Sequence, residues 1–337
     1  MNRWIDIILC CTLMLCLNAC RVHELPVGSS EVDVTLHLSF DRSLLPYQTV
    51  AYPSDTKADG RPLLARYDMR LYRGVPGNFE REAFLTRSFT SAKTDDLDCD
   101  VTLQLKAGRY LVQLWVDFVP EGEEAFWDAT SFQAIGLNGD YAGGDQRRDA
   151  FYIRQELPLE TLITAGSSYE ATLILGRPLA QYRFIATDKD EFLHFWTIES
   201  ALRHGYSVKQ NIAPEELDAF RVRVVYPQYL PNAFNLWSDR ASDAGMGYSF
   251  WTKMHLREDG DVDLCWDWVL VGPEEGLVVV SLEFYDPNGE YISTFRNFEV
   301  PLRRSGVTTV QGRILTAGVD SGIAIDPTFD GEFNVYL

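Results

Sequence analysis

The chain has 337 residues, 46% of them hydrophobic, which is enough to build more than one buried core. It carries 49 acidic against 30 basic residues, a formal net charge of −19 at pH 7. A surface with this excess of negative charge repels the phosphates of nucleic acids, which excludes nucleic acid as a partner.

The first nineteen residues are typical of an export signal. Arg3 and the free amine give a positive start, residues 7–17 are apolar, and Ala19 is the small residue that a signal peptidase requires. This apolar run is shorter than the roughly 20 residues that a membrane-spanning helix needs, which argues against a retained transmembrane anchor. We therefore expect residues 1–19 to be a signal peptide.

The end of this segment, Leu17-Asn18-Ala19-Cys20, resembles the lipobox of bacterial lipoproteins. The resemblance implies that Cys20 is lipidated and that residues 20–30 form a tether. Two or more acyl chains hold a protein firmly at a membrane, because each buried methylene contributes about 0.8 kcal/mol. The alternative is ordinary signal cleavage, with Cys20 merely close to the cut.

Strands dominate the chain after the tether. Residues 32–40 alternate between apolar and polar side chains, the pattern of a half-buried strand. The turn Asp286-Pro287-Asn288-Gly289 predicts that 277–285 folds back onto 290–298. Further strands are predicted at 67–73, 101–105, 109–118, 169–175, 182–186, 220–226, 263–270, 307–315 and 332–337.

One short helix is predicted after the strand at 182–186. Asp188 and Glu191 form a start like a capping box, and Gly205 can end the helix. We interpret its apolar side chains as packing residues, namely Phe192, Trp196 and Leu202.

Frequent strands with so few helices favour an all-β fold of two tandem antiparallel β-sandwiches. Each half opens and closes with a strand, which predicts an N-terminal sandwich at 31–176 and a C-terminal sandwich at 177–337. The turn-rich stretch 119–150 has little periodicity, and we expect it to be an excursion of the first domain.

The second half resembles the two-domain fimbrillin-like lipoproteins of Bacteroides and relatives, which are kin of fimbrial subunits and anchors with transthyretin-like, Greek-key sandwiches. The matching stretches are FRVRVVYPQYLPNAFNL, FYDPNGEYI, VPLRRSGVTTVQGRILT and GIAIDPTFDGEFNVYL, and LKAGRYLVQLWVDF in the first half is similar to a strand of that family. The resemblance implies an outer-membrane, lipid-anchored protein at the cell surface. Its expected partners are other fimbrial subunits or a host or bacterial surface ligand.

Subunits of that family associate by strand donation, in which an extended segment of one subunit completes a sheet of another. The alternating C-terminal residues Phe333, Val335 and Leu337 are candidates for such a strand. The alternative is that they complete the second sandwich of their own chain. Some relatives are also cut after a basic residue, for which the candidates are Arg42, Arg61 and Arg66.

The sequence contains no recognised catalytic or metal-binding motif. The five histidines lack the spacing of a zinc site, DGDVD at 259–263 lacks the rest of a calcium loop, and TDDLDCD at 94–100 reads as a solvated turn. Cys99 and Cys265 are expected to be unpaired, with a disulfide left open. We expect no metal, no cofactor and no enzymatic activity.

Two other functions stay open. A glycan-binding lipoprotein is suggested by Trp127, Trp237, Trp251, Trp266 and Trp268, although most of these should lie in the core. A hydrolase that uses two carboxylates would need them about 5 to 9.5 Å apart, a distance that the sequence does not give.

Overall fold

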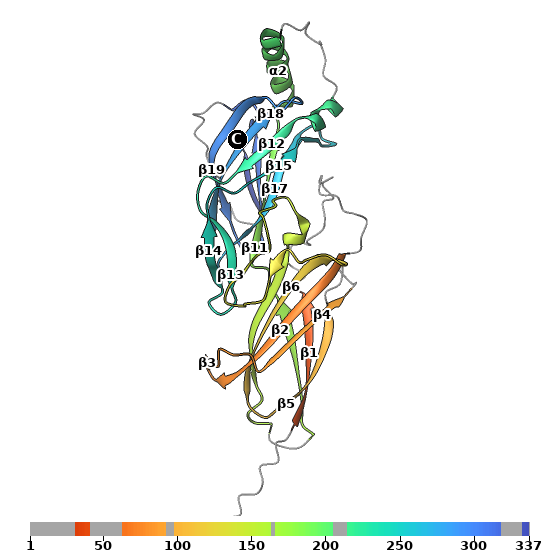
Figure 1. The fold of residues 1–337 in the computed structure, drawn as a ribbon, viewed down its shortest axis with the longest axis vertical. Helices are drawn as coiled ribbons and strands as arrows, with labels where there is room; N and C mark the ends of the chain where they lie inside the picture. The colour runs from red at the N-terminus through yellow and green to blue at the C-terminus, as the bar shows by residue number, and fades with distance from the viewer. Residues whose placement is uncertain are drawn as a thin grey trace, which may run out of the picture.

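A computed structural model gives the fold and describes residues 31–40, 63–91, 98–162, 166–204, 214–317 and 332–336. Two β-sandwiches lie end to end along the longest axis, the first in orange to yellow-green and the second in green to blue (Figure 1). The predicted all-β class with one α-helix among the described residues is confirmed. The domain division at residues 176 and 177 stays a prediction.

The first sandwich packs two sheets around a core that contains Val34, Leu36, Val112 and Leu114. These side chains alternate along their strands with residues of the opposite face, so each strand contributes one apolar side. One sheet has the order β10 (Ser168–Leu175), β1 (Glu31–Phe40) and β5 (Cys99–Lys106). The other has the order β3 (Asn78–Phe79), β2 (Leu63–Val75), β6 (Arg109–Pro120) and β9 (Ala150–Pro158), with β4 (Leu85–Ser91) also paired to β2.

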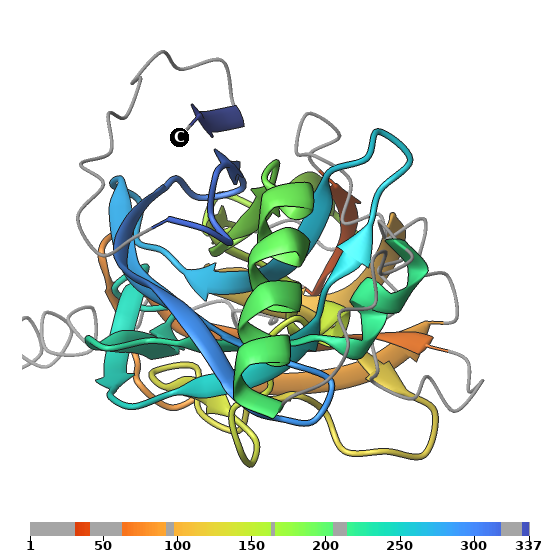
Figure 2. The same ribbon diagram turned by 90° about the horizontal axis from the view of Figure 1, so that it is seen from above.

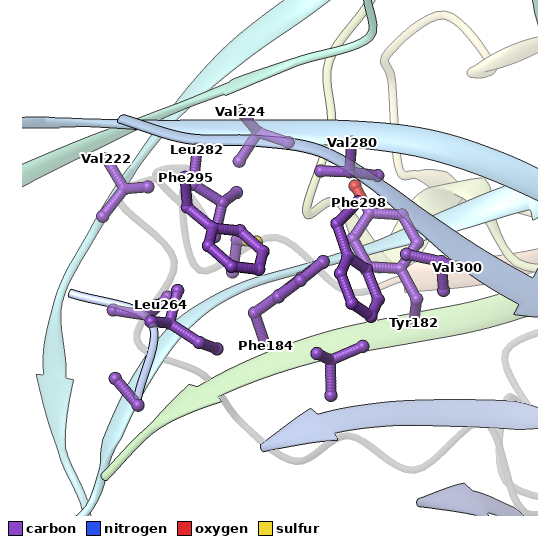
Figure 3. Packing of buried hydrophobic residues seen from close by; sticks show 14 of the residues in the cluster. Tyr182, Phe184, Val222, Val224, Leu264, Val280, Leu282, Phe295, Phe298 and Val300 are labelled. Atoms are coloured by element: carbon purple, nitrogen blue, oxygen red, sulfur yellow. The ribbon is translucent and has the colours of Figure 1, made fainter. Parts of the chain in front are cut away.

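The second sandwich is built in the same way. Its aromatic centre is Phe184, whose ring lies 6.2 Å from that of Phe295 and 5.7 Å from that of Phe298, between the two sheets (Figure 3). One sheet has the order β16 (His255–Leu256), β17 (Val262–Leu270), β11 (Leu179–Ala186), β20 (Val307–Gly312) and β21 (Glu332–Tyr336). The other has the order β15 (Ser249–Lys253), β12 (Arg221–Val225), β18 (Gly276–Tyr285) and β19 (Tyr291–Leu302).

The predicted hairpin at 277–298 is confirmed as β18 and β19, which pair antiparallel. Asp286 closes the turn by accepting the backbone N–H groups of Asn288 and Glu290, each at 2.8 Å. Gly289 has φ +84°, a conformation that glycine adopts without strain. The local sequence was sufficient here because the turn carries its own hydrogen bonds.

A fifth sheet joins the two sandwiches, which the sequence did not predict. It has the order β14 (Arg240–Gly245), β13 (Leu230–Asn235), β8 (Ile135–Leu137) and β7 (Trp127–Asp128). β8 belongs to the stretch 119–150, and it pairs with β13 of the second half through Ala233 and Phe234. This stretch is therefore more than an excursion of the first domain.

The predicted helix is α2 (Lys189–His204), which lies over the end of the second sandwich that faces away from the first (Figures 1 and 2). Phe192 is buried and Trp196 packs on Phe220 with 5.0 Å between ring centroids, as expected of packing residues. Leu202 is 75% exposed, so its assignment as a packing residue was wrong. It lies about 80° around the helix from Phe192, toward exposed Phe195.

Asp188 has a tertiary contact that the sequence pattern did not reveal. Its carboxylate accepts the backbone N–H groups of Ile314, Leu315 and Thr316 at 3.2, 3.2 and 2.7 Å. The residue before α2 therefore fixes the segment that follows β20.

Candidate functional site

The predicted partner strand forms the edge of a sheet in its own chain. β21 pairs in parallel with β20, placing Phe333 opposite Thr308 and Val335 opposite Val310. Leu337 lies outside the described residues, as does Cys20. β21 therefore lies where the alternative interpretation placed it, in the second sandwich of its own chain. Its exchange between chains and the lipidation of Cys20 stay predictions.

The two sandwiches share a pairing pattern that makes their edges comparable. In the first, β1 lies between antiparallel β5 and parallel β10. In the second, β11 lies between antiparallel β17 and parallel β20. β1 thus corresponds to β11, and β10 corresponds to β20. The outer edge of β20, which faces away from β11, carries β21. The equivalent edge in the first sandwich is the outer edge of β10, which faces away from β1.

The counterpart edge of β10 carries no paired strand among the described residues, apart from one bridge between Tyr152 and Gly176 at its end. Its side chains alternate between exposed and more buried, and Ile174 is 59% exposed. An unpaired strand edge offers backbone N–H and C=O groups to another strand. β10 is therefore a candidate acceptor for an added strand.

Arg66, one of the candidate cleavage residues, has a structural role. Its guanidinium donates to Asp117 Oδ1 at 2.8 Å and to the carbonyl oxygen of Trp127 at 2.9 Å. A protease would have to open β2 to reach it. Arg42 and Arg61 lie outside the described residues.

The residues considered for metal binding or catalysis do not converge in the described part of the chain. No group of three or more His, Cys, Asp or Glu side chains there could hold a metal ion. Asp259 accepts the backbone N–H of Asp261 at 3.1 Å and pairs with Arg257, so DGDVD forms a turn between β16 and β17. Residues 94–97 of the other acidic loop lie outside the description.

Cys99 and Cys265 are both unpaired, as expected. Cys265 is buried in the second sandwich, and Cys99 is half-buried in the first. Burial raises the pKa of both thiols, which keeps them protonated at neutral pH and poor as nucleophiles. No helix in the described ranges is long and apolar enough to cross a bilayer.

Four of the five tryptophans considered for glycan binding pack at the junction between the two sandwiches. Trp127, Trp266 and Trp268 are buried in one cluster with Trp115 of β6. Trp237 packs edge-on against Tyr72 of β2 at 4.7 Å between ring centroids. Trp251 alone of the five is exposed, at 55%.

This cluster is a core between the sandwiches. β6 of the first sandwich supplies Trp115, β13 supplies Phe234, and β17 of the second supplies Trp266 and Trp268. Trp266 and Trp268 share one face of their strand, as the sequence predicted, but that face points away from the interior that Cys265 and Val269 fill.

A buried polar network locks the same junction. Asp267 of β17 is fully buried and accepts Arg148 Nη1 at 2.5 Å, the backbone N–H of Gly144 at 3.2 Å and the hydroxyl of Tyr226 at 2.5 Å. It also accepts the hydroxyl of Tyr141. Arg148 belongs to the short 3-10 helix Gln146–Arg148 that leads into β9, so the Asp267 network joins both sandwiches.

Two further ion pairs support the junction. Arg177 donates to Asp149 at 2.8 and 3.0 Å, and both side chains are buried. Arg304 donates to Asp239 at 2.9 Å and to the hydroxyl of Tyr152 on β9 at 2.5 Å. For Arg148 and Asp149 the only sequence signal was the polar run QRRD at 146–149, which gives no indication of their distant partners.

Comparison with known proteins finds one family model that matches most of the chain. A family model described as a family of unknown function (DUF6562) matches residues 26–336. No curated protein matches the chain. The similar solved structures include proteins named as adhesins and as fimbrial proteins.

Three of these structures illustrate the similarity. A candidate adhesin from Bacteroides ovatus is 11% identical, with a TM-score of 0.42 and coverage of 79% of this chain and 78% of the other. A protein from Bacteroides thetaiotaomicron, described as a candidate polysaccharide-binding protein, is 8% identical, with a TM-score of 0.40 and coverage of 79% and 80%. The fimbrial anchor protein Mfa2 from Porphyromonas gingivalis is 11% identical, with a TM-score of 0.37 and coverage of 78% and 82%.

Replacing the buried carboxylate should destabilise the whole junction. We expect Asp267→Asn to lower the free energy of unfolding in urea by about 3 kcal/mol, because Arg148 keeps its charge without a charged partner. The control is Arg313→Ala, whose ion pair with Glu191 is more than half exposed, and it should cost less than about 1 kcal/mol. Equal losses in the two variants would contradict the role of Asp267.

Alkaline pH should weaken the same network. Burial raises the pKa of Tyr141, Tyr182 and Tyr226, so these hydroxyls stay neutral in the folded chain while the unfolded chain ionises them. The contribution of these hydroxyls to the free energy of unfolding should therefore be constant below the ordinary tyrosine pKa of about 10 and fall above it. Tyr182→Phe should make that fall shallower by about 1.4 kcal/mol per pH unit. An unchanged slope in urea titrations from pH 9 to 11 would contradict this.

Proposed function

The chain belongs to the family of unknown function DUF6562, and from that premise we propose that it is a lipid-anchored surface protein of fimbria assembly or adhesion. Its contacts with other subunits are made by addition of β-strands. The observation that carries the proposal is the pair of equivalent edges, one with a terminal strand on it and one without a strand among the described residues.

The tether supports attachment close to the membrane. β1 begins at Glu31, and the roughly ten residues after Cys20 reach at most about 35 Å when fully extended. The first sandwich therefore lies near the bilayer and the second points outward, carrying β21. This placement suits a base or anchor subunit, because the acyl chains hold one end while the far end makes contacts.

The junction supports a role in bearing load. The buried contacts of Asp267 and Arg177 and the partly buried contact of Arg304 with Tyr152 join the sandwiches at separate points. Two sandwiches joined in this way transmit a pull from the outer end to the tether without a hinge. A surface protein held by its amino terminus requires this property when partners attach to the other end.

Lipidation can be tested directly at Cys20. We expect Cys20→Ala to abolish labelling by an alkyne fatty acid and to move the protein from the outer-membrane fraction to the soluble fraction, because its thiol is the acylation site. Cys99→Ala is the matched control, since Cys99 is also unpaired and lies in the folded part of the chain. Labelling that survives in Cys20→Ala would refute the anchor.

Strand addition at β10 can be tested with Ile174→Lys. A charge on an exposed edge strand blocks pairing with another strand while leaving the fold intact. We expect a photoreactive residue at Thr172 to crosslink to another subunit on intact cells, and Ile174→Lys to remove that adduct with less than about 0.5 kcal/mol change in stability. The control is Leu277→Lys on β18, since Leu277 is 60% exposed. An adduct that persists in Ile174→Lys would contradict pairing at this edge.

A further inference from the structure

The outer face of the sheet β15-β12-β18-β19 has an unusual set of side chains. Val222, Val224, Leu282 and Phe284 point into the core of the second sandwich. By the alternation of a strand, the residues between them point outward. The register places Trp251 opposite Arg223 and Arg223 opposite Glu283 in one outward row.

A second outward row continues this face. Lys253 lies opposite Arg221, Arg221 opposite Tyr285, and Tyr285 opposite Tyr291 of β19. Four strands therefore contribute to one surface, and these strands lie side by side in the second sandwich (Figure 1).

Three aromatic rings on this face are in contact with one another. The ring centroids of Trp251 and Tyr285 are 4.9 Å apart and the planes tilt by 59°, and Tyr285 meets Tyr291 edge-on at 5.9 Å. Trp251 is 55% exposed and Tyr291 is 46% exposed. These rings are not part of the core of the sandwich, so their apolar surface faces solvent. Tilted, half-exposed rings form a shallow cradle against which the apolar face of a sugar ring can stack.

Polar groups next to the rings are held in fixed positions. Arg223 donates to Glu283 Oε2 and to Ser249 Oγ, both at 3.3 Å. The hydroxyl of Tyr285 donates to the same Glu283 oxygen at 2.9 Å. Such preorganised donors and acceptors give a ligand with several hydroxyl groups defined hydrogen bonds at a low entropic cost.

The charge of the face indicates which kind of sugar it suits. β12 places Arg221 and Arg223 on it and β15 places Lys253, beside the carboxylate of Glu283 from β18. This positive patch occurs in a chain whose formal net charge is −19. At physiological ionic strength charges are screened beyond about 8 Å, so a short ligand senses the patch rather than the whole protein.

We propose that this face binds an acidic saccharide. A sugar ring stacks in the cradle of Trp251 and Tyr285, and a carboxylate of the ligand, such as that of a uronic acid, pairs with Arg221. Nucleic acid does not fit, because its closely spaced phosphates extend over a surface that is acidic elsewhere. This proposal does not depend on strand addition, which uses the edge of β10 in the other sandwich.

The test is isothermal titration calorimetry of the mature chain with a trisaccharide of galacturonic acid and with the matched neutral trisaccharide of galactose. We expect the acidic probe to bind at least tenfold more tightly than the neutral one. Trp251→Ala should weaken binding of the acidic probe at least tenfold, because stacking is lost. Arg221→Gln should reduce the preference for the acidic probe over the neutral one.

The controls separate this proposal from folding and from strand addition. Tyr229→Ala removes an aromatic residue that is 70% exposed but lies in the loop after β12, and it should bind as the wild type does. Ile174→Lys should also bind as the wild type does. Failure of the acidic trisaccharide to bind, equal binding of the neutral probe, or unchanged affinity in a folded Trp251→Ala variant would each overturn the proposal.

Discussion

The buried carboxylate of Asp267 is the contact on which the arrangement of the two sandwiches depends. It lies within the second sandwich, but Tyr141, Gly144 and Arg148 reach it from the stretch that connects β8 to β9 of the first. Removing two charges from water costs several kcal/mol per ion, and only close pairing offsets that cost. The second sandwich therefore keeps its polar interior satisfied only while this stretch stays docked.

Docking of this stretch also decides where the aromatic side chains lie. Trp115, Trp127, Trp266 and Trp268 fill the space between the sandwiches, and Trp127 donates its indole N–H to the carbonyl oxygen of Arg148 at 3.0 Å. Low local polarity strengthens the hydrogen bonds of the network, and the network in turn fixes the faces that the rings cover. The aromatic cluster and the ion pairs thus stabilise the same junction in complementary ways.

The two proposed interaction surfaces follow from what this junction leaves uncovered. The edge of β10 lies in the first sandwich, and the aromatic face around Trp251 lies in the second. They differ in chemistry, since one offers backbone hydrogen bonds and the other offers rings and charged side chains. Both surfaces can be occupied at once, because the junction between the sandwiches keeps them at a constant separation.

The sequence by itself determined the elements whose cause is local. Period-two alternation indicated β1, the Asp-Pro-Asn-Gly turn indicated the hairpin of β18 and β19, and frequent strands with few helices indicated the all-β class. The sequence predicted that Trp266 and Trp268 share one face of a strand, but not that this face lies between the sandwiches. It did not predict the sheet in which β8 pairs with β13. Only the tertiary structure decided those points, because the partners of Arg148, Trp127 and β8 are distant in the chain. Long-range contacts depend on how whole sheets pack, and no local pattern encodes them.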